Sequence, residues 1–426
     1  MYWRTRFGAA PPPRGKTHVA GINFKGDRRP AMLIGGDNSN GAKAFSLYLH
    51  IPYCQSKCPY CDFNSHAAAS WPEDDYVRAL VAEIERRASE APWAGRPLKT
   101  IFFGGGTPSL FQPESIAAIV AAAARNFGIE TGAEVTLEAN PGTVDAAKLG
   151  GMRAAGVNRI SFGAQSFNEA RLKFLGRIHS VGETREAARI AHRAGFERLN
   201  LDLIFAVPGQ SVDEVLNDIA QAAALGPDHI SAYNLTFEEG TAFFTEMKRG
   251  QIRPLDSDRQ AEFYAAVREE LPRRGYRMYE ISNYAPPGHE ARHNLSYWRA
   301  ESYLGLGAGA HSFARGEGGG SGRRWWNERV PVRYVERALA GGLAEAGGET
   351  VKADGARGEF VFLNLRLREG FALADFETRF GASFDSVFGA RAARLFEGEL
   401  LVRDEGRIYL SERGLELADS VFAEFI

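Results

Sequence analysis

The sequence predicts an α/β protein in which a partial (β/α)6 barrel of the TIM type is followed by a small winged-helix-like domain. Short apolar stretches alternate with longer amphipathic ones, which predicts parallel strands joined by right-handed helical crossovers. Polar residues cluster just past the carboxyl ends of the predicted strands, where barrel enzymes hold their sites. The alternation ends near residue 240 of the 426, so a different architecture is expected beyond that point.

The predicted barrel occupies residues 45–240. Its strands are SLYLHI (46–51), KTIFFGG (99–105), EVTLEA (134–139), RISFGA (159–164), LNLDLIF (199–205) and HISAYNL (229–235). The helices expected between them cover 76–88, 113–127, 144–156, 182–195 and 211–226. Several begin at a capping residue or Pro and end at Gly, as helix boundaries do. Six strands fit either an open sheet or an incomplete barrel, and the polar strand ends favour the barrel.

Residues 1–44 are basic and rich in Pro and Gly without apolar periodicity, which predicts a disordered leader. An organellar leader is the alternative, although the Pro run and the absence of Ser before Ser39 weaken it. The chain has no run of about 18 apolar residues, so no transmembrane segment is expected. Three cysteines without an evident disulfide framework favour a cytoplasmic setting.

Beyond the barrel, residues 241–350 are expected to extend it, with a helix over 258–275 and the segment HNLSYW at 293–298. Residues 351–426 are expected to form the winged-helix-like domain, because helical stretches precede two short strands about the D-E-G turn of LLVRDEGRIYLS. This segment has 10 Lys and Arg against 14 Asp and Glu, a net charge of −4. A DNA-binding surface should be basic, so no nucleic-acid partner is expected.

All the cysteines of the chain, Cys54, Cys58 and Cys61, lie within HIPYCQSKCPYCDFNSH. A disulfide would leave one of the three cysteines unpaired, which disfavours this interpretation. A structural zinc needs four ligands, and although His50 or His66 could complete the set, the usual paired spacing is absent. Three ordinary buried cysteines would not concentrate in one loop. Iron–sulfur cubanes take one thiolate per iron, so we favour a [4Fe–4S] cluster with one iron open to a ligand that carries an amine and a carboxylate.

The C-x3-C-x2-C spacing resembles the radical S-adenosylmethionine (SAM) superfamily, in which the reduced cluster cleaves SAM to a 5′-deoxyadenosyl radical. GGGTPS (104–109) resembles the glycine-rich motif that meets the amino-acid end of SAM there. An ordinary tight turn is the alternative for this segment. The adjacent cysteine loop favours the cofactor-binding interpretation.

The likeness extends over nearly all of residues 45–426. LYLHIPYCQSKCPYCDFNSH, FFGGGTPSLF, LEANPGT, RISFGAQSFN, LGRIHS and LNLDLIFAVPGQ resemble the family of anaerobic coproporphyrinogen III oxidases and related heme chaperones. The resemblance implies SAM-contacting positions at Tyr48, Tyr60, Gly105, Gly106, Thr107, Glu138, Gln165, Arg177 and Asp202. In it, Asp202 and Glu138 accept from ribose hydroxyls or the amine, Gln165 bonds the ribose, and Arg177 pairs with the SAM carboxylate. Taken singly, each residue has an ordinary structural explanation: Glu138 and Asp202 could cap strand ends, and Arg177 could be an exposed surface charge.

Two features separate the oxidases from the chaperones. The oxidase pattern has a fourth cysteine two positions beyond the third, where this chain has Phe63. HNLSYW matches a signature associated with the chaperones, in which the histidine is a proposed heme ligand. The match implies that His293 ligates heme, while Tyr297 and Trp298 provide flat apolar area for the macrocycle. His311, in GAGAHSF, is the competing histidine.

The sequence therefore predicts a cytoplasmic radical SAM-type protein that binds a [4Fe–4S] cluster, SAM and heme and passes heme to acceptor proteins. Homodimer formation and peripheral membrane contact are left open. The rival hypothesis is an oxygen-independent oxidase that decarboxylates coproporphyrinogen III to protoporphyrinogen IX. A radical enzyme that acts on another substrate is a third, weaker hypothesis.

Overall fold

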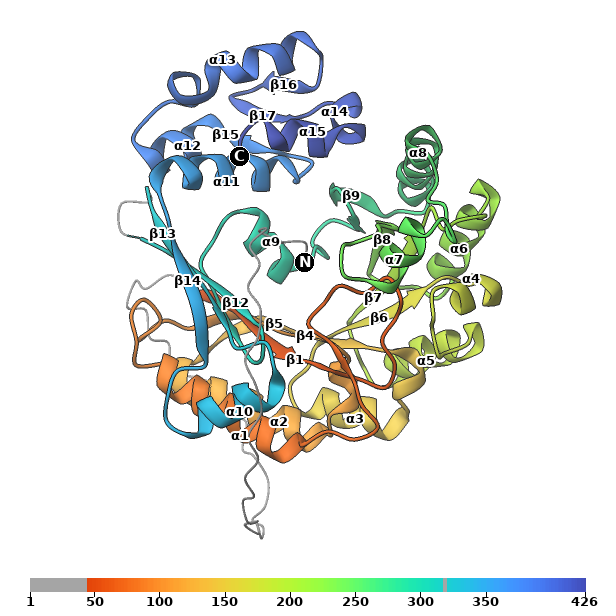
Figure 1. The fold of residues 1–426 in the computed structure, drawn as a ribbon, viewed down its shortest axis with the longest axis vertical. Coiled ribbons are helices and arrows are strands. Elements are labelled where there is room, and N and C mark those ends of the chain that lie inside the picture. Colours follow the sequence, from red (N-terminus) through yellow and green to blue (C-terminus); the bar gives the residue numbers. More distant parts are fainter. Residues whose placement is uncertain (1–43, 317–319) are drawn as a thin grey trace. The chain divides into compact units, whose positions relative to one another are not determined.

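The computed structural model describes residues 44–316 and 320–426, so the predicted leader lies outside the described residues apart from Ala44. A 12-stranded sheet organises the chain in the order β14-β13-β12-β11-β1-β4-β5-β6-β7-β8-β10-β9 (Figure 1). Its parallel centre comprises β11 (Tyr303–Leu306), β1 (Phe45–Ile51), β4 (Leu98–Gly105), β5 (Ile129–Ala139), β6 (Arg159–Gln165), β7 (Arg198–Phe205) and β8 (His229–Asn234). The predicted partial barrel is confirmed.

The strands of the predicted barrel differ little from their expected ranges. The largest difference is at β5, which begins at Ile129 rather than at residue 134. The additional parallel strand, β11, comes from the extension and pairs with β1 on the side opposite β4. The sequence did not predict it, because YLGL is short and runs into a glycine-rich turn.

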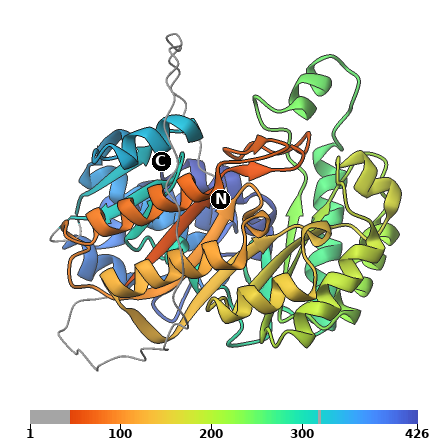
Figure 2. The ribbon, with the colours of Figure 1, turned by 90° about the horizontal axis from the view of Figure 1, so that it is seen from below.

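Helices cross between the strands and cover the outer face of the sheet. They are α1 (Glu73–Arg87), α2 (Pro113–Phe127), α3 (Ala146–Ala154), α4 (Glu169–Phe174), α5 (Val181–Arg193) and α6 (Val212–Ala224). The capping boxes of α5 and α6 start at Ser180 and Ser211, where a serine and a glutamate satisfy each other's backbone amides. Figure 2 shows α1, α2 and α3, in orange and yellow, in front of the strands.

The two faces of the sheet differ in polarity. On β6, Ile160 and Phe162 belong to the main hydrophobic core. Ser161 lies on the opposite face, where it accepts a hydrogen bond of 2.7 Å from Asn200 Nδ2 of β7. Because side chains alternate along a strand, the barrel interior is lined by polar groups, and the site must form there or at the strand ends.

Residues after β8 extend the sheet at both edges. One edge carries β10 (Asn283–Ala285) and β9 (Arg277–Glu280), after α7 (Ala242–Lys248) and α8 (Ser257–Arg273). The other carries β12 (His311–Arg315), β13 (Gly322–Asn327) and β14 (Glu345–Val351). HNLSYW lies in α9 (Arg292–Trp298), and α10 (Pro331–Leu339) follows β13.

The C-terminal residues have a hydrophobic core of their own. It is formed by α11 (Ala353–Leu365), β15 (Phe371–Ala372), α12 (Leu373–Phe380), α13 (Phe384–Glu397), β16 (Leu401–Asp404), β17 (Arg407–Leu410), α14 (Glu412–Glu416) and α15 (Ala418–Ala423). As predicted, β16 and β17 flank the D-E-G turn, in which Glu405 and Gly406 both have positive φ. Trp298 packs against this core, so it joins the barrel extension to the C-terminal region.

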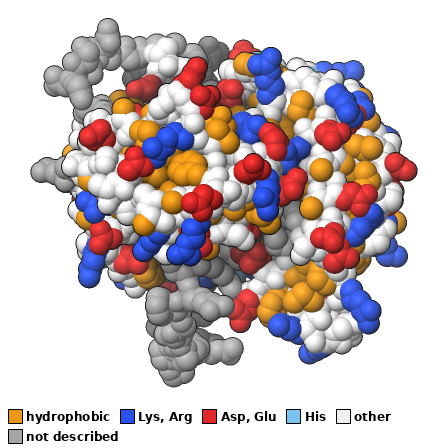
Figure 3. All heavy atoms as spheres, turned by 90° about the horizontal axis from the view of Figure 1, so that it is seen from above, with side chains coloured by type: hydrophobic (Ala, Val, Ile, Leu, Met, Phe, Trp, Pro, Cys, Tyr) orange, Lys and Arg blue, Asp and Glu red, His pale blue; other side chains and the backbone are white. Residues whose placement is uncertain are grey.

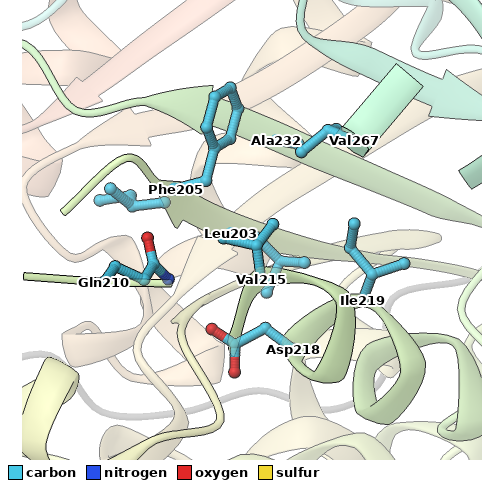
Figure 4. A pocket seen from close by; sticks show the side chains of 9 residues that line it. Leu203, Phe205, Gln210, Val215, Asp218, Ile219, Ala232 and Val267 are labelled. Carbon is cyan, nitrogen blue, oxygen red and sulfur yellow. The ribbon is translucent and has the colours of Figure 1, made fainter. Parts of the chain in front are cut away.

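A small cavity lies outside the barrel interior, between α6, α8 and the strands β7 and β8 (Figure 4). Its volume is about 10 Å³, room for at most one water. Asp218 at its wall already accepts hydrogen bonds of 2.7 Å from Ser166 Oγ and Phe167 N. This cavity is therefore too small for a cofactor.

No helix in residues 44–316 and 320–426 is long and apolar enough to cross a membrane. Figure 3 shows one face of the molecule, on which acidic and basic side chains are interspersed. That face carries no extended basic patch of the kind that binds nucleic acid.

Candidate cofactor site

The three cysteines lie on one loop at the carboxyl end of β1. The short strands β2 (Tyr53–Cys54) and β3 (His66–Ala67) pair in parallel and close this loop. A turn inside it brings Cys61 N to 3.1 Å from the Cys58 carbonyl. Cys54 is buried, and Cys58 and Cys61 are half-buried. The structure thus brings the predicted ligands together at the mouth of the barrel.

Each thiol has a polar neighbour. Thr107 Oγ1 donates to Cys54 Sγ at 3.4 Å, and Arg177 Nη1 donates to Cys58 Sγ at 3.3 Å. Cys61 Sγ lies 3.6 Å from Ser65 Oγ. Burial raises the pKa of the Cys54 and Cys61 thiols, while the hydrogen bonds from Thr107 and Ser65 oppose this rise and the nearby Cys58 thiol adds to it. Three crowded thiols of this kind suit a cationic iron core, which would hold them as thiolates.

The residues around the loop disfavour zinc. His50 is engaged at both ring nitrogens: Nδ1 bonds the Tyr48 hydroxyl and Nε2 the Asn64 carbonyl, each at 2.9 Å. The ring of His66 bonds the Arg329 carbonyl. Across the described ranges, no three Cys, His, Asp or Glu side chains are close enough to hold one metal ion. A cubane spreads its ligands further apart, because each thiolate binds its own iron.

The glycine-rich turn runs directly beside the cysteine loop. Gly106 N donates to the Ile51 carbonyl at 2.7 Å, and Thr107 N donates to the Tyr53 carbonyl at 2.8 Å. A Cβ at Gly106 would lie 2.6 Å from the Tyr53 carbonyl oxygen. At Gly105, φ is +114° and a Cβ would lie 2.5 Å from the His50 ring. Both positions therefore require glycine, which keeps the turn open toward a ligand.

Two predicted carboxylates share the barrel interior. Glu138 Oε2 accepts from Gly105 N at 3.2 Å, and Asp202 accepts from Asn200 Nδ2 at 2.8 Å. Burial, and then the charge of Asp202, raise the pKa of Glu138 to about 7. Burial also raises the pKa of Asp202. Neither carboxylate forms an ion pair within the described part of the chain, so the pair suits a cation such as the sulfonium group of SAM.

Gln165 and Arg177 meet at the end of β6. Gln165 has φ of +65°, a strained value for a non-glycine residue and common at functional sites. A Cβ built on Gly163 would lie 2.7 Å from Gln165 Nε2 and 3.2 Å from Arg177 Nη2. Tyr60 hydrogen-bonds Arg177, which places the aromatic ring beside the Cys58 contact. The guanidinium thus lies against the cluster loop, and its Nε has no hydrogen-bond partner among the described residues.

The nine predicted SAM positions share one property: each is half-buried, so all of them are accessible to a ligand. They are Tyr48, Tyr60, Gly105, Gly106, Thr107, Glu138, Gln165, Arg177 and Asp202. Tyr48 stacks on Phe102 with ring centroids 6.1 Å apart. Half-buried polar groups next to buried apolar ones are the expected lining of a binding site.

The predicted heme residues are arranged differently. His293 is only 1% exposed, and its ring bonds Thr100 Oγ1 through Nδ1 and the Tyr297 hydroxyl through Nε2, each at 2.8 Å. Burial first, and then the charge of Lys99, lower the pKa of His293 to about 3, so the ring is neutral. Trp298 instead lies under Arg366, whose guanidinium carbon is 4.4 Å from the ring centroid. The structure brings His293 and Tyr297 together and places Trp298 at a separate contact.

Sequence reasoning missed several supporting residues. Asn200 and Ser161 fix Asp202 through side-chain hydrogen bonds. Asn64 fixes the cysteine loop to carbonyls more than 240 positions away in the sequence. Its place three residues after Cys61 was visible, but no pattern identifies so distant a partner.

A parallel partial barrel with three converging thiols at its mouth defines a radical SAM-type protein. The Radical SAM superfamily model matches residues 48–222, and the HemN C-terminal domain model matches residues 354–417. A radical SAM domain implies a [4Fe–4S] cluster and SAM.

Two relatives and one solved structure indicate which family of radical SAM proteins the chain is similar to. The heme chaperone HemW of Lactococcus lactis is 34% identical over 90% of this chain and 98% of its own length. HemW of Escherichia coli is 45% identical over 62% of this chain and 69% of its own. The structure of E. coli coproporphyrinogen III oxidase matches with a TM-score of 0.76 and 24% identity over 90% of each chain, which establishes a shared fold. The chain belongs to the HemW family of radical SAM proteins.

Proposed function

We propose that this protein is a heme chaperone that binds heme and delivers it to acceptor proteins. The observation that supports this most is the match, over nearly their whole length, to relatives named heme chaperone HemW. Phe63 stands where the oxidase pattern has its fourth cysteine, which agrees with the chaperone rather than the oxidase. A cytoplasmic location, a homodimer and peripheral membrane contact stay predictions.

We also propose that Cys54, Cys58 and Cys61 hold the [4Fe–4S] cluster and that the half-buried polar positions hold SAM. When bound, the cluster supplies an electron and an open iron. The chain's own residues supply the rest: Glu138 and Asp202 accept from the amine or from the ribose hydroxyls. Arg177, beside Cys58, provides positive charge for the carboxylate of SAM.

His293 is also the proposed heme ligand. Its hydrogen bonds and its burial define what must change before heme can bind. Nε2 already bonds Tyr297, so the iron must take the place of that hydroxyl. The ring is neutral, which is the ligating form of imidazole. Because His293 is buried, α9 must also open to admit a macrocycle.

Replacing His293 tests this ligand. Hemin titrated into His293→Ala is expected to bind at least tenfold more weakly than to wild type, about 1.4 kcal/mol, with a shifted Soret band. His311→Ala is the matched control, since that exposed side chain lies on β12 beside Trp326, whereas His293 bonds Thr100 of the central strand β4. A loss confined to His311→Ala would move the ligand there, and unchanged spectra in both variants would remove both residues.

The oxidase is tested separately. Wild type with reconstituted cluster, SAM, a reductant and coproporphyrinogen III is expected to form no vinyl product under anaerobic conditions, while hemin-loaded protein passes heme to an apo heme protein. Formation of protoporphyrinogen IX would contradict a chaperone-only function.

A further inference from the structure

Two side chains join the cysteine loop to the barrel extension: the ring of His66, which bonds the Arg329 carbonyl, and the amide of Asn64, which makes two contacts. Asn64 Nδ2 donates to the carbonyls of Ala308 and Arg329, each at 2.9 Å. The backbone carbonyl of Asn64 bonds His50 Nε2, also at 2.9 Å. One residue therefore connects the end of β1, the turn after β11 and the segment before α10.

The turn that receives Asn64 is itself held rigidly. Gly307 N donates to Glu83 Oε2 at 3.0 Å, and Ala308 N donates to the Tyr76 hydroxyl at 2.8 Å. Tyr76 in turn donates to the His50 carbonyl at 2.8 Å. Glu83 is 3% exposed and also accepts from Tyr334 and Asn327, each at 2.7 Å. Such a buried network of hydrogen bonds resists displacement.

Glycines bring the turn this close to the loop. Gly309 has φ of +73°, and a Cβ there would lie 2.5 Å from Asn64 Nδ2. Gly307 has φ of +100°, and a Cβ there would lie 2.5 Å from the His50 carbonyl oxygen. The contact between loop and turn thus depends on backbone that no other residue type adopts easily.

We propose that Asn64 is a positioning residue for the cluster and that the extension, through the turn at 307–309, forms part of the cluster site. Asn64 follows Cys61 by three residues and fixes the loop just beyond the last thiol. Without its two side-chain hydrogen bonds, the loop keeps its three thiols but loses two of the hydrogen bonds that hold it against the extension. This inference rests on the proposed [4Fe–4S] cluster and is independent of heme.

The test compares Asn64→Ala and Gly309→Ala with Asn126→Ala, whose Nδ2 donates to one carbonyl within α2 at 2.9 Å. After anaerobic reconstitution, the first two variants are expected to lose their clusters in air roughly tenfold faster than wild type, in line with two lost hydrogen bonds. The EPR spectrum of their reduced cluster should change, while the melting temperature of the Asn64→Ala apo-protein and the Asn126→Ala cluster stay as in wild type.

Cluster lifetimes and spectra equal to wild type in Asn64→Ala would overturn the inference. So would an equal loss of apo-protein stability in Asn64→Ala, because Asn64 would then support the fold in general. A wild type that takes up no cluster would instead remove the proposed [4Fe–4S] cluster itself, so the two failures are distinguishable.

Discussion

A Cys58→Ala variant, reconstituted anaerobically with iron and sulfide, is expected to hold almost no cluster, against about four iron atoms per wild-type chain. The three thiols are the only sulfur ligands that cysteine offers in this sequence. Cys58 also accepts from Arg177 at 3.3 Å, so its loss leaves a half-buried guanidinium without that partner. Iron and acid-labile sulfide content measure the effect, with circular dichroism to confirm that the variant folds.

The matched control is Ser65→Ala. Ser65 lies 3.6 Å from Cys61 Sγ but is not a proposed ligand. This variant is expected to keep nearly the full iron content. Full iron in Cys58→Ala, or a single zinc in wild type, would show that the thiols do not hold a cubane.

The affinity of the reconstituted protein for SAM is expected to rise by roughly tenfold between pH 6 and pH 8, about fivefold of it below pH 7, and to level off above pH 8. Glu138 has a pKa of about 7 in the site without ligand. A cation binds the ionised carboxylate, so below pH 7 binding must displace a proton, and above it this cost disappears. Asp202 opposes ionisation of Glu138 from β7, while Arg159 on β6 favours it.

Glu138→Gln is expected to bind SAM more weakly and without this pH dependence. Calorimetry at pH 6, 7 and 8 measures the affinity for SAM and its pH dependence in each variant. Glu130→Gln is the control, because this exposed glutamate lies on the same strand outside the site. The assignment of Glu138 fails if the wild-type affinity is flat over this range, or if the slope persists in Glu138→Gln.

Local sequence patterns predicted the barrel because each strand and helix carries its own signal. The capping residues of α5 and α6 and the apolar runs of β6 and β7 are readable within a few positions. The strand β11 carries no such signal: its pairing with β1 joins residues about 250 positions apart, such as Ser46 and Tyr303. Long-range pairing is decided by tertiary packing rather than by local propensity.

The candidate site also contains features that the local sequence predicted and features that it could not predict. Cys54, Glu138 and Gln165 were predicted to converge because parallel strands end at one edge of the barrel, and the structure brings them to the barrel mouth and interior. The hydrogen-bond partners of individual side chains could not be predicted. The sequence could not indicate that His293 has both ring nitrogens engaged. It also could not indicate that Arg177 contacts Cys58.

The most direct test of the three-thiolate cluster is the EPR spectrum of the reduced, reconstituted protein recorded with and without SAM. An iron that lacks a protein ligand should gain the amine and carboxylate of SAM, so the g values are expected to shift on addition of SAM. A spectrum that saturating SAM leaves unchanged would contradict the open iron and, with it, the cofactor site described for this chain.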